Sequence, residues 1–459
     1  MALGRRRREE QRQFWIATQD MPDVPRHVFY EKLNKLLDEG GFDDYVERLC
    51  EDYYARGVGR PGIPPGIYFR MLFIGYFEDI GSQRGIAWRC ADSLSLKAFL
   101  GYEPTEDTPD HSSLTRVRKR LPLEVHKKVF AFVLSLAADH KLLGGKTVLV
   151  DATTLEADAA MKSIVRRETG EDWKEYITRL AEEDGVEIQT EEDLRRYDKN
   201  RPDKKVSNEQ WESSTDPDAR ITKMKDGRTH LAYKAEHTVD NESEFILDAS
   251  VYHADRSDAD TLLESVTEAQ ENLDEAESGH EIAEAVADKG YHKNETLADC
   301  RECRIRTYIP EPERGKRRWT DKPAEYEQAF RANRRRVRGE RSRRLQRQRS
   351  ERVERSFAHV CETGGARRSW LKGLTDVNKR YKIQAAARNL GLLMRALFGV
   401  GKPRCLQGGC GGCFCCFCAL FEPLIPLCRP FVGPERTQSN FRSLFASSAP
   451  AGGPLTSAA

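Results

Sequence analysis

The chain has 459 residues, long enough for two or three domains, and 32% of them are charged. A mean hydropathy of −0.69 and the lack of a long apolar run argue against a membrane protein. We expect no secretory signal either, because no apolar core follows the basic residues 1–13. Seven of the twelve cysteines crowd into residues 405–428, unlike a secreted disulfide framework, so the expected location is cytoplasmic.

The net charge of +1 hides two segments of opposite sign. From residue 313 to 349 there are fifteen Lys or Arg against five Asp or Glu, a local balance of +10. From residue 255 to 288 there are twelve acidic residues against Arg256 alone. The basic block predicts a polyanionic partner such as DNA.

Residues 1–20 are predicted to form a basic, flexible start, and residues 21–140 an all-helical module. Apolar residues recur at helical spacing from about Phe29 to Leu136. Pro64 and Pro65 are typical of the first turn of an apolar helix that runs to Phe77.

The last short helix of this module is amphipathic and basic. Leu114, Val117 and Leu121 form its apolar face. The basic residues are Arg116, Arg118, Lys119 and Arg120. Such a helix can lie in a DNA groove, and a solvated helix face is an equally good interpretation of the segment alone.

Two strand-like runs in the second half of the chain end in an aspartate. The first runs from Lys146 to Asp151 and the second from Ile282 to Asp288. A single aspartate at a strand end often caps the next turn, but the pattern recurs, and Glu354 follows in an arginine-rich helix. Acidic residues at strand ends are typical of the edge where an open sheet gathers its chemistry.

The elements between these residues predict an α/β domain over residues 141–400. A hairpin is expected at 229–253, an acidic helix at 257–276, a strand at 305–310 and helices at 295–303, 341–361 and 376–398. Charged insertions are expected at about 161–211, as helices or a mobile excursion, and at 311–345.

The order of these elements predicts where the acidic residues meet. If the two aspartate-bearing strands pair in parallel through a crossover, Asp151 and Asp288 converge across 137 positions of sequence. On the later helix Val353, Phe357 and Val360 predict a buried stripe with Glu354 beside it. Glu351, one turn earlier, is the rival third carboxylate.

Three carboxylates in one pocket repel one another unless a cation neutralises them. Oxygen ligands of this kind suit Mg²⁺ or Mn²⁺. Two such ions, about 3.5–4 Å apart, are typical of in-line phosphoryl displacement.

Several segments resemble the DDE transposases of bacterial insertion sequences. They are Asp151-Ala-Thr-Thr, Ala287–Tyr291, Val353–Phe357, Gly59–Pro65 and Pro109–Leu114. The resemblance runs from about residue 25 to 404. It implies an RNase H-like catalytic domain with a mixed five-stranded sheet, in which Asp151, Asp288 and Glu354 bind two metal ions.

The same resemblance implies the partners and the reaction. The front helices would bind the terminal inverted repeats of the element, and the protein would assemble on DNA as a homodimer. The reaction would be hydrolysis of a phosphodiester at the element's end, then attack of the freed 3′ hydroxyl on target DNA.

One part of the family pattern is missing. Relatives place Tyr, then Arg three later, Glu four further on and Lys seven beyond, whereas this chain has Arg347, Ser350 and Cys361 around Glu354. Other basic residues are candidates for the phosphate contacts. These are Lys289, Arg343, Arg347, Arg349, Arg367, Arg368 and Lys372. Trp319 either stacks on an unpaired base or, as the preferred interpretation, anchors its insertion to the core.

Two alternative functions remain open from the sequence. One is a nuclease of the same fold that cuts without joining, and the other is a DNA-binding protein that has lost catalysis. Residues 401–459, rich in Cys, Gly and Pro, are predicted to be a disordered tail. Cys410–Cys418 lacks the second ligand pair of a zinc site, which makes a metal site the weaker interpretation.

Overall fold

The computed structural model describes residue 4 and residues 27–403, except 56–58, 60–61, 203–205, 225–226, 314 and 316. The chain divides into two compact units, Met1–Gln407 and Gly408–Ala459. Most of the predicted basic start, and all of the predicted tail from residue 404 on, lie outside the described residues. The described part of the chain contains no helix long and apolar enough to cross a membrane.

The front of the chain is helical, as predicted. Its helices are α1 (Val28–Glu39), α2 (Phe42–Cys50), the 3₁₀ helix η2 (Glu51–Tyr53), α3 (Pro65–Phe77), α4 (Gln83–Asp92), α5 (Leu94–Leu100), α6 (His111–Arg120) and α7 (Leu123–Asp139). The nearly all-apolar helix α3 is buried on almost every side and starts at Pro65. Its one charged residue, Arg70, is fully buried and pairs with Asp38 at 2.9 Å and Asp43 at 3.2 Å.

A mixed sheet forms the centre of the second half. Its strands are β1 (Thr147–Glu156), β4 (Arg220–Lys223), β5 (Thr229–Asp240), β6 (Ile246–His253), β7 (Glu284–Val286) and β8 (Arg306–Tyr308). Strand β1 lies between β5, which is antiparallel to it, and β7, which is parallel, and β8 continues the parallel side. The predicted α/β class is confirmed, but the sheet has six strands rather than five, because β4 pairs with the part of β5 that β6 leaves open.

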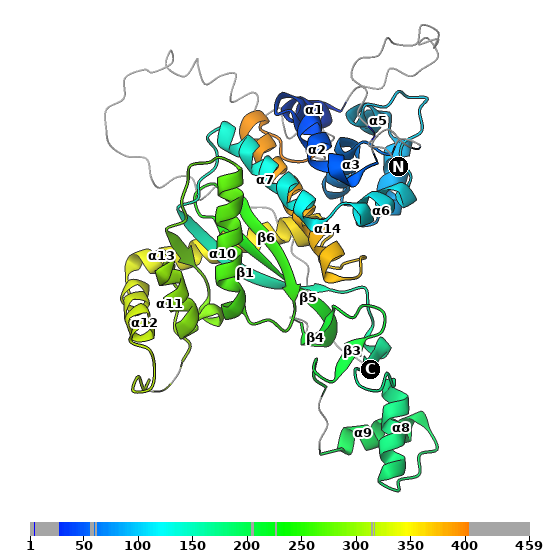
Figure 1. Ribbon diagram of the computed structural model, residues 1–459, viewed down its shortest axis with the longest axis vertical. Coiled ribbons are helices and arrows are strands. Elements are labelled where there is room, and N and C mark those ends of the chain that lie inside the picture. Colours follow the sequence, from blue (N-terminus) through cyan, green and yellow to red (C-terminus); the bar gives the residue numbers. More distant parts are fainter. Residues whose placement is uncertain are drawn as a thin grey trace, which may run out of the picture. The chain divides into compact units, whose positions relative to one another are not determined.

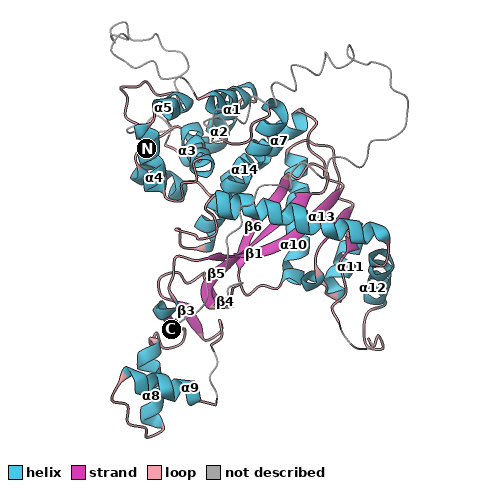
Figure 2. Ribbon diagram, turned by 180° about the vertical axis from the view of Figure 1, so that it is seen from behind, coloured by secondary structure: helices cyan, strands magenta, loops and turns pink. Residues whose placement is uncertain are grey.

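Helices cover both faces of this sheet. Figure 1 shows α10 (Asp258–Glu275) across one face, and Figure 2, from behind, shows α13 (Glu340–Phe357) crossing the other. Helices α11 (Asn294–Glu302) and α12 (Ala324–Val337) pack beside β8. The predicted basic insertion at 311–345 is therefore largely α12 and the first turns of α13.

The last helix, α14 (Leu374–Phe398), joins the two regions because it packs on α7, α3 and β6. It is preceded by a π-helix, η5 (Ala358–Thr363), that continues α13. On α14 the buried Lys382 donates to Asp248 of β6 at 2.5 Å, so a buried ion pair fastens α14 to the sheet.

The charged segment at 161–211 contains regular structure. It holds η3 (Met161–Ser163), β2 (Ile164–Arg166), α8 (Trp173–Glu183), α9 (Glu191–Asn200) and β3 (Trp211–Ser213). Both helices begin with a capping box, from Asp172 and from Thr190. Of the two interpretations of this segment, the charged helical insertion is the one the structure has.

Candidate active site

Asp151 and Asp288 come from neighbouring parallel segments of the sheet. The β1–β7 register pairs Thr147 with Glu284 and Leu149 with Val286, and Asp288 follows two residues after β7 ends. Strand β1 does not end at Asp151 as predicted but continues to Glu156, and the Asp151 and Asp288 carboxylates interact electrostatically. The structure therefore brings these two predicted residues together.

The Asp151 carboxylate is partly buried and already hydrogen-bonded. Its Oδ1 accepts from the Ala152 N–H at 2.9 Å, and its Oδ2 accepts from the Arg349 guanidinium at 2.6 Å. Burial raises the pKa of this carboxyl, and Asp288 acts in the same direction, whereas Arg349 and the Ala152 N–H oppose the rise. A cation beside Asp151 thus stabilises its ionised form.

Asp288 caps the short turn that follows its strand. Its Oδ1 accepts from the Gly290 N–H at 2.7 Å, at the start of the 3₁₀ helix η4 (Lys289–Tyr291). A Cβ at Gly290 would lie 3.0 Å from both Asp288 Oδ1 and Asp258 Oδ2, so the Asp258 carboxylate comes close to this turn. Asp258, from the first turn of α10, is thus a further carboxylate at this edge that the sequence did not single out.

Helix α13 is held across the edge by polar contacts from its buried face. Gln346 Nε2 donates to the carbonyl oxygen of Ala287, which follows β7, at 3.0 Å and to that of Tyr308, which ends β8, at 2.8 Å. Arg349, one turn later, reaches Asp151. The helix therefore presents an amide and a guanidinium to the edge.

Glu354 lies on the exposed side of α13. Val353 is fully buried, as are Ser356 and Val360, and a helix turns by about 100° per residue, which carries Glu354 out toward solvent. The predicted stripe of Val353, Phe357 and Val360 is confirmed. The rival Glu351 is exposed too and pairs with Arg355 at 2.5 Å.

The residues present fit a divalent cation in part. Asp151 and Asp288 supply hard oxygen donors side by side, which suits Mg²⁺ or Mn²⁺. Among the described residues, no group of three His, Cys, Asp or Glu side chains is placed to hold a metal ion. The third donor is what the arrangement lacks, because α13 directs Arg349 rather than Glu354 at the edge.

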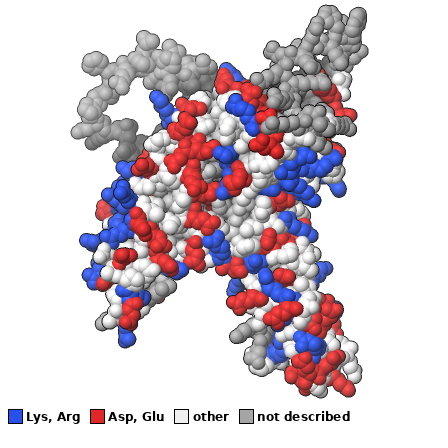
Figure 3. Space-filling view, in the orientation of Figure 1, with Lys and Arg blue, Asp and Glu red and all other residues white. Residues whose placement is uncertain are grey.

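The basic helix α6 divides its four predicted residues between surface and interior. Arg116 and Lys119 are exposed, and Arg120 stacks over the Tyr54 ring at 4.7 Å. Arg118 is buried and donates to Asp376 of α14 at 3.1 Å. Figure 3 shows the Lys and Arg side chains gathered over α6 and along α12 and α13, and the carboxylates over α10.

Other predicted DNA-binding residues lie near the sheet edge. Lys289, Arg343 and Arg347 are exposed. Trp319 packs on Phe330 of α12 with ring centroids 5.2 Å apart, so it anchors its segment as the preferred interpretation had it. His292 is buried beside the same ring, 5.9 Å away.

Arg367 and Arg368 lie on a segment fastened to the end of β1. Arg367 donates to Thr153 Oγ1 at 3.1 Å and pairs with Glu362 at 2.6 Å. The Arg368 guanidinium lies 3.9 Å from Glu156. Backbone hydrogen bonds from Glu156 N to Arg367 O, at 3.0 Å, and from Ser369 N to Glu156 O, at 2.8 Å, hold the segment in place.

The chain has a helical front and a mixed α/β domain, and comparison with known families indicates the class of protein to which they belong. Residues 19–120 match the family described as Transposase domain (DUF772), and residues 278–394 match the Transposase DDE domain. No curated protein and no solved structure matches the chain. The two domain matches confirm the resemblance to DDE transposases and indicate that the chain is a transposase.

Asp288 and Glu354 lie within the second match, whereas Asp151 lies in neither. The sequence did not reveal the Arg349–Asp151 ion pair, the contacts of Gln346 or the approach of Asp258. Helical phase offered a signal for the first two, because positions 342, 345, 346, 349, 353 and 356 share one face of α13.

Proposed function

We propose that this transposase cleaves DNA at the ends of its element and joins them to target DNA, with Asp151 and Asp288 holding a divalent cation. The observation that supports the proposal is the parallel pairing of β1 with β7, together with the electrostatic interaction between the Asp151 and Asp288 carboxylates. When bound, the cation would lower the pKa of the attacking water or hydroxyl and stabilise the leaving oxygen.

The chain's own residues have separate parts in this reaction. In the first step a water oxygen attacks phosphorus, the bond from phosphorus to the 3′ oxygen breaks, and that oxygen takes up a proton. In the second step the freed 3′ hydroxyl attacks a phosphodiester of the target. Arg349, which lies at Asp151, would contact the phosphate once the carboxylate is engaged by the cation.

The DNA itself would be held by the exposed basic residues. Arg116 and Lys119 on α6 are candidates for the terminal inverted repeats, and Lys289, Arg343 and Arg347 for the DNA near the reacting phosphate. Assembly as a homodimer on two element ends belongs to the same proposal.

The test is a cleavage and joining assay with duplex DNA that carries an element end. We expect products with Mg²⁺ or Mn²⁺ and none with a chelator, and Asp288→Asn should abolish both steps. Asp274→Asn, an exposed aspartate on α10, is the matched control and should act like the wild type. Metal-independent cleavage would contradict the proposal, and cleavage without joining would favour the nuclease.

The third carboxylate needs its own comparison. Glu354→Gln and Glu351→Gln change two exposed residues of one helix by the same chemistry. If α13 rotates or shifts to complete the site on DNA, Glu354→Gln loses activity and Glu351→Gln keeps it. Equal activity of both variants would remove Glu354 from the proposal.

A specific observation also favours a second candidate, a DNA-binding protein without catalysis. Glu354 is exposed, and Arg349 occupies the position at Asp151 that a cation would need. For such a protein Asp151→Asn and Asp288→Asn would leave DNA affinity unchanged, and no product would form with any metal.

A further inference from the structure

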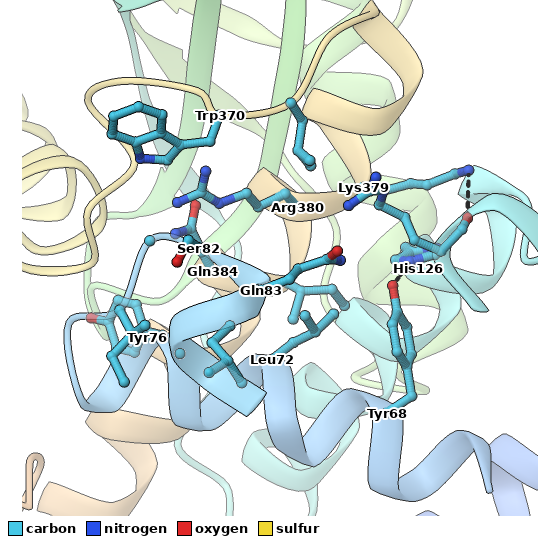
Figure 4. Close-up of a pocket in the computed structure, with 17 residues that line it drawn as sticks. Tyr68, Leu72, Tyr76, Ser82, Gln83, His126, Trp370, Lys379, Arg380 and Gln384 are labelled. Atoms are coloured by element: carbon cyan, nitrogen blue, oxygen red, sulfur yellow. Dashed lines mark hydrogen bonds between the residues drawn. The ribbon is translucent and has the colours of Figure 1, made fainter. Parts of the chain in front are cut away.

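A cavity of about 210 Å³ lies between α3, α4 and α14, away from the acidic edge. Its walls are mostly apolar, from Leu72, Ile86 and Ile383, among others. Figure 4 shows Trp370 and the Arg380 guanidinium at one end, and Tyr68 with His126 at the other. We call it the Trp370 cavity.

The Trp370 cavity has more positive charge than its surroundings neutralise. Arg118, Lys379 and Arg380 line it, and none of the described residues that line it is acidic. Arg118 and Lys379 share one carboxylate, Asp376, at 3.1 and 3.4 Å. The Nη1 atom of the buried Arg118 has no hydrogen-bond partner.

Arg380 is the least compensated of these cations. Its Nη2 donates to the Gly365 carbonyl at 3.2 Å, and within the described part of the chain it forms no ion pair. Burial, and then the nearby Arg118, lower the pKa of its guanidinium to about 10, so it is still charged at neutral pH. Arg380 is partly buried and has no counter-ion among the described residues, and the buried Arg118 beside it has an unpartnered Nη1, which indicates that an anion completes this site.

An aromatic ring stands beside this cation. Trp370 is 52% exposed although it is large and apolar. A Cβ at Gly81 would lie 3.1 Å from the Trp370 Nε1 and 3.5 Å from Arg380 Nη2, so both side chains lie close to this glycine. An exposed indole next to a partly buried guanidinium matches a ligand that carries both a flat ring and a phosphate.

The position of the cavity connects it with the DNA path. Trp370 directly follows the segment fastened to Glu156, and Asp151 lies five positions earlier on β1, about 17 Å along the strand. Arg367 and Arg368 lie between the two. A DNA strand that leaves Asp151 in this direction would pass these basic residues, and 17 Å is roughly five base-pair steps of B-DNA.

We propose that the Trp370 cavity receives one unpaired nucleotide of the DNA substrate, its base stacked on Trp370 and its phosphate held by Arg380. The proposal rests on DNA being the substrate. The apolar walls suit the base, and Arg118 adds to the positive charge at the phosphate. A single nucleotide is what the volume admits, because a base pair would not fit.

The test compares two probes with the full chain: a paired 25-base-pair duplex and the same duplex with one bulged thymidine. We expect wild-type protein to bind the bulged duplex more tightly. Trp370→Ala should weaken that binding by roughly 5- to 100-fold, the range for loss of one stacked base, and leave the paired duplex unaffected. Trp370→Phe keeps an aromatic face and should restore most of the preference.

Two controls separate the cavity from general effects. Trp88→Ala removes another exposed tryptophan, 67% exposed, on α4 and outside the cavity, and should change neither affinity. Arg380→Gln should reduce the preference for the bulge as Trp370→Ala does. Thymidine monophosphate serves as a competitor and tests whether the cavity binds a free nucleotide. Displacement of the bulged duplex but not of the paired duplex would support the site.

The outcomes distinguish this proposal from the transposase chemistry. If the protein binds paired duplex without preference for the bulge, or Trp370→Ala weakens both probes equally, the nucleotide site is overturned and the proposed function stands. If thymidine monophosphate binds but no bulge preference exists, the proposal is overturned as well. If the protein binds no DNA at all, the proposed function fails with it.

Discussion

The acidic edge of the sheet and the Trp370 cavity differ in the sign of their uncompensated charge. At the edge, Asp151 pairs with Arg349 and lies close to a second carboxylate, Asp288, so negative charge exceeds positive. In the cavity, Arg118 and Lys379 share Asp376 and Arg380 has no ion pair among the described residues, so positive charge exceeds negative. This contrast is why we propose a cation as the ligand at the edge and an anion as the ligand in the cavity.

The largest expected difference between the two regions is in catalysis. Asp151→Asn removes a proposed metal ligand and should lower the rate of end cleavage by roughly 10³-fold or more, since a bound metal supplies several kcal/mol of transition-state stabilisation. Trp370→Ala should lower it far less. Single-turnover cleavage with Mg²⁺ measures the rates of both variants. Equal losses of rate would contradict the separate roles of the edge and the cavity.

The cavity should also make the protein sensitive to acid. Burial lowers the pKa of His126 to about 4, and Lys379 and Arg118 act in the same direction while Asp376 and the Pro122 carbonyl oppose them. The pKa of His126 is lower in the folded protein than in the unfolded chain. The stability that the neutral His126 contributes is therefore fully present above pH 6.5 and is lost as the pH falls toward 4. It amounts to about 3 kcal/mol.

Urea unfolding at pH 7.5 and pH 4.5 measures this effect. His126→Asn should reduce the loss of stability between the two pH values, because it keeps a donor for Pro122 but does not titrate. His140→Asn, an exposed histidine at the end of α7, is the control and should keep the wild-type dependence. Identical slopes for wild type and His126→Asn would contradict the prediction.

Removal of one arginine from each region should change stability in opposite directions. Arg380→Met deletes a partly buried cation that forms no ion pair among the described residues, and should raise the free energy of unfolding by up to about 1 kcal/mol without DNA. Arg349→Met leaves the Asp151 carboxylate beside Asp288 without its cation and should lower it by about 1 kcal/mol, a modest value because both groups are partly exposed. Denaturation in metal-free buffer checks both signs, and the same sign for both would refute the comparison.

The smallest effect is expected at the surface of α6. Lys119→Ala should weaken duplex binding a few-fold and reduce the slope of log affinity against log salt by about 1. Arg118→Met, one residue earlier but buried, should leave that slope unchanged. Fluorescence anisotropy across a salt series gives both slopes, and a changed slope for Arg118→Met would move this residue from the cavity to the DNA surface.

The sequence was sufficient where strand patterns decide the geometry. Asp151 and Asp288 each follow an apolar run, and these runs pair in parallel as β1 and β7, although β1 continues beyond Asp151 and Asp288 lies past the end of β7. The helical front followed from apolar spacing, and the buried stripe of Val353, Phe357 and Val360 from helical period.

The sequence was insufficient for features that depend on how a helix is rotated about its axis or on how several distant segments come together. One position separates the buried Val353 from the exposed Glu354, and a pattern of charges does not fix which face of α13 meets the sheet. The cavity is formed by Gly81, Arg118, Trp370 and Arg380, which come from distant segments. The β4 strand is short and partly polar, so no local pattern predicted its pairing with β5.

Backbone hydrogen bonds between Glu156 and the segment from Arg367 to Ser369 fix that segment to the end of β1. From Asp151 to Glu156 strand β1 is paired with β5, so the interval between the two proposed ligand sites is set by the protein rather than by the DNA. A protein with this arrangement would select the bound nucleotide by its distance from the cleavage site and not by its base sequence.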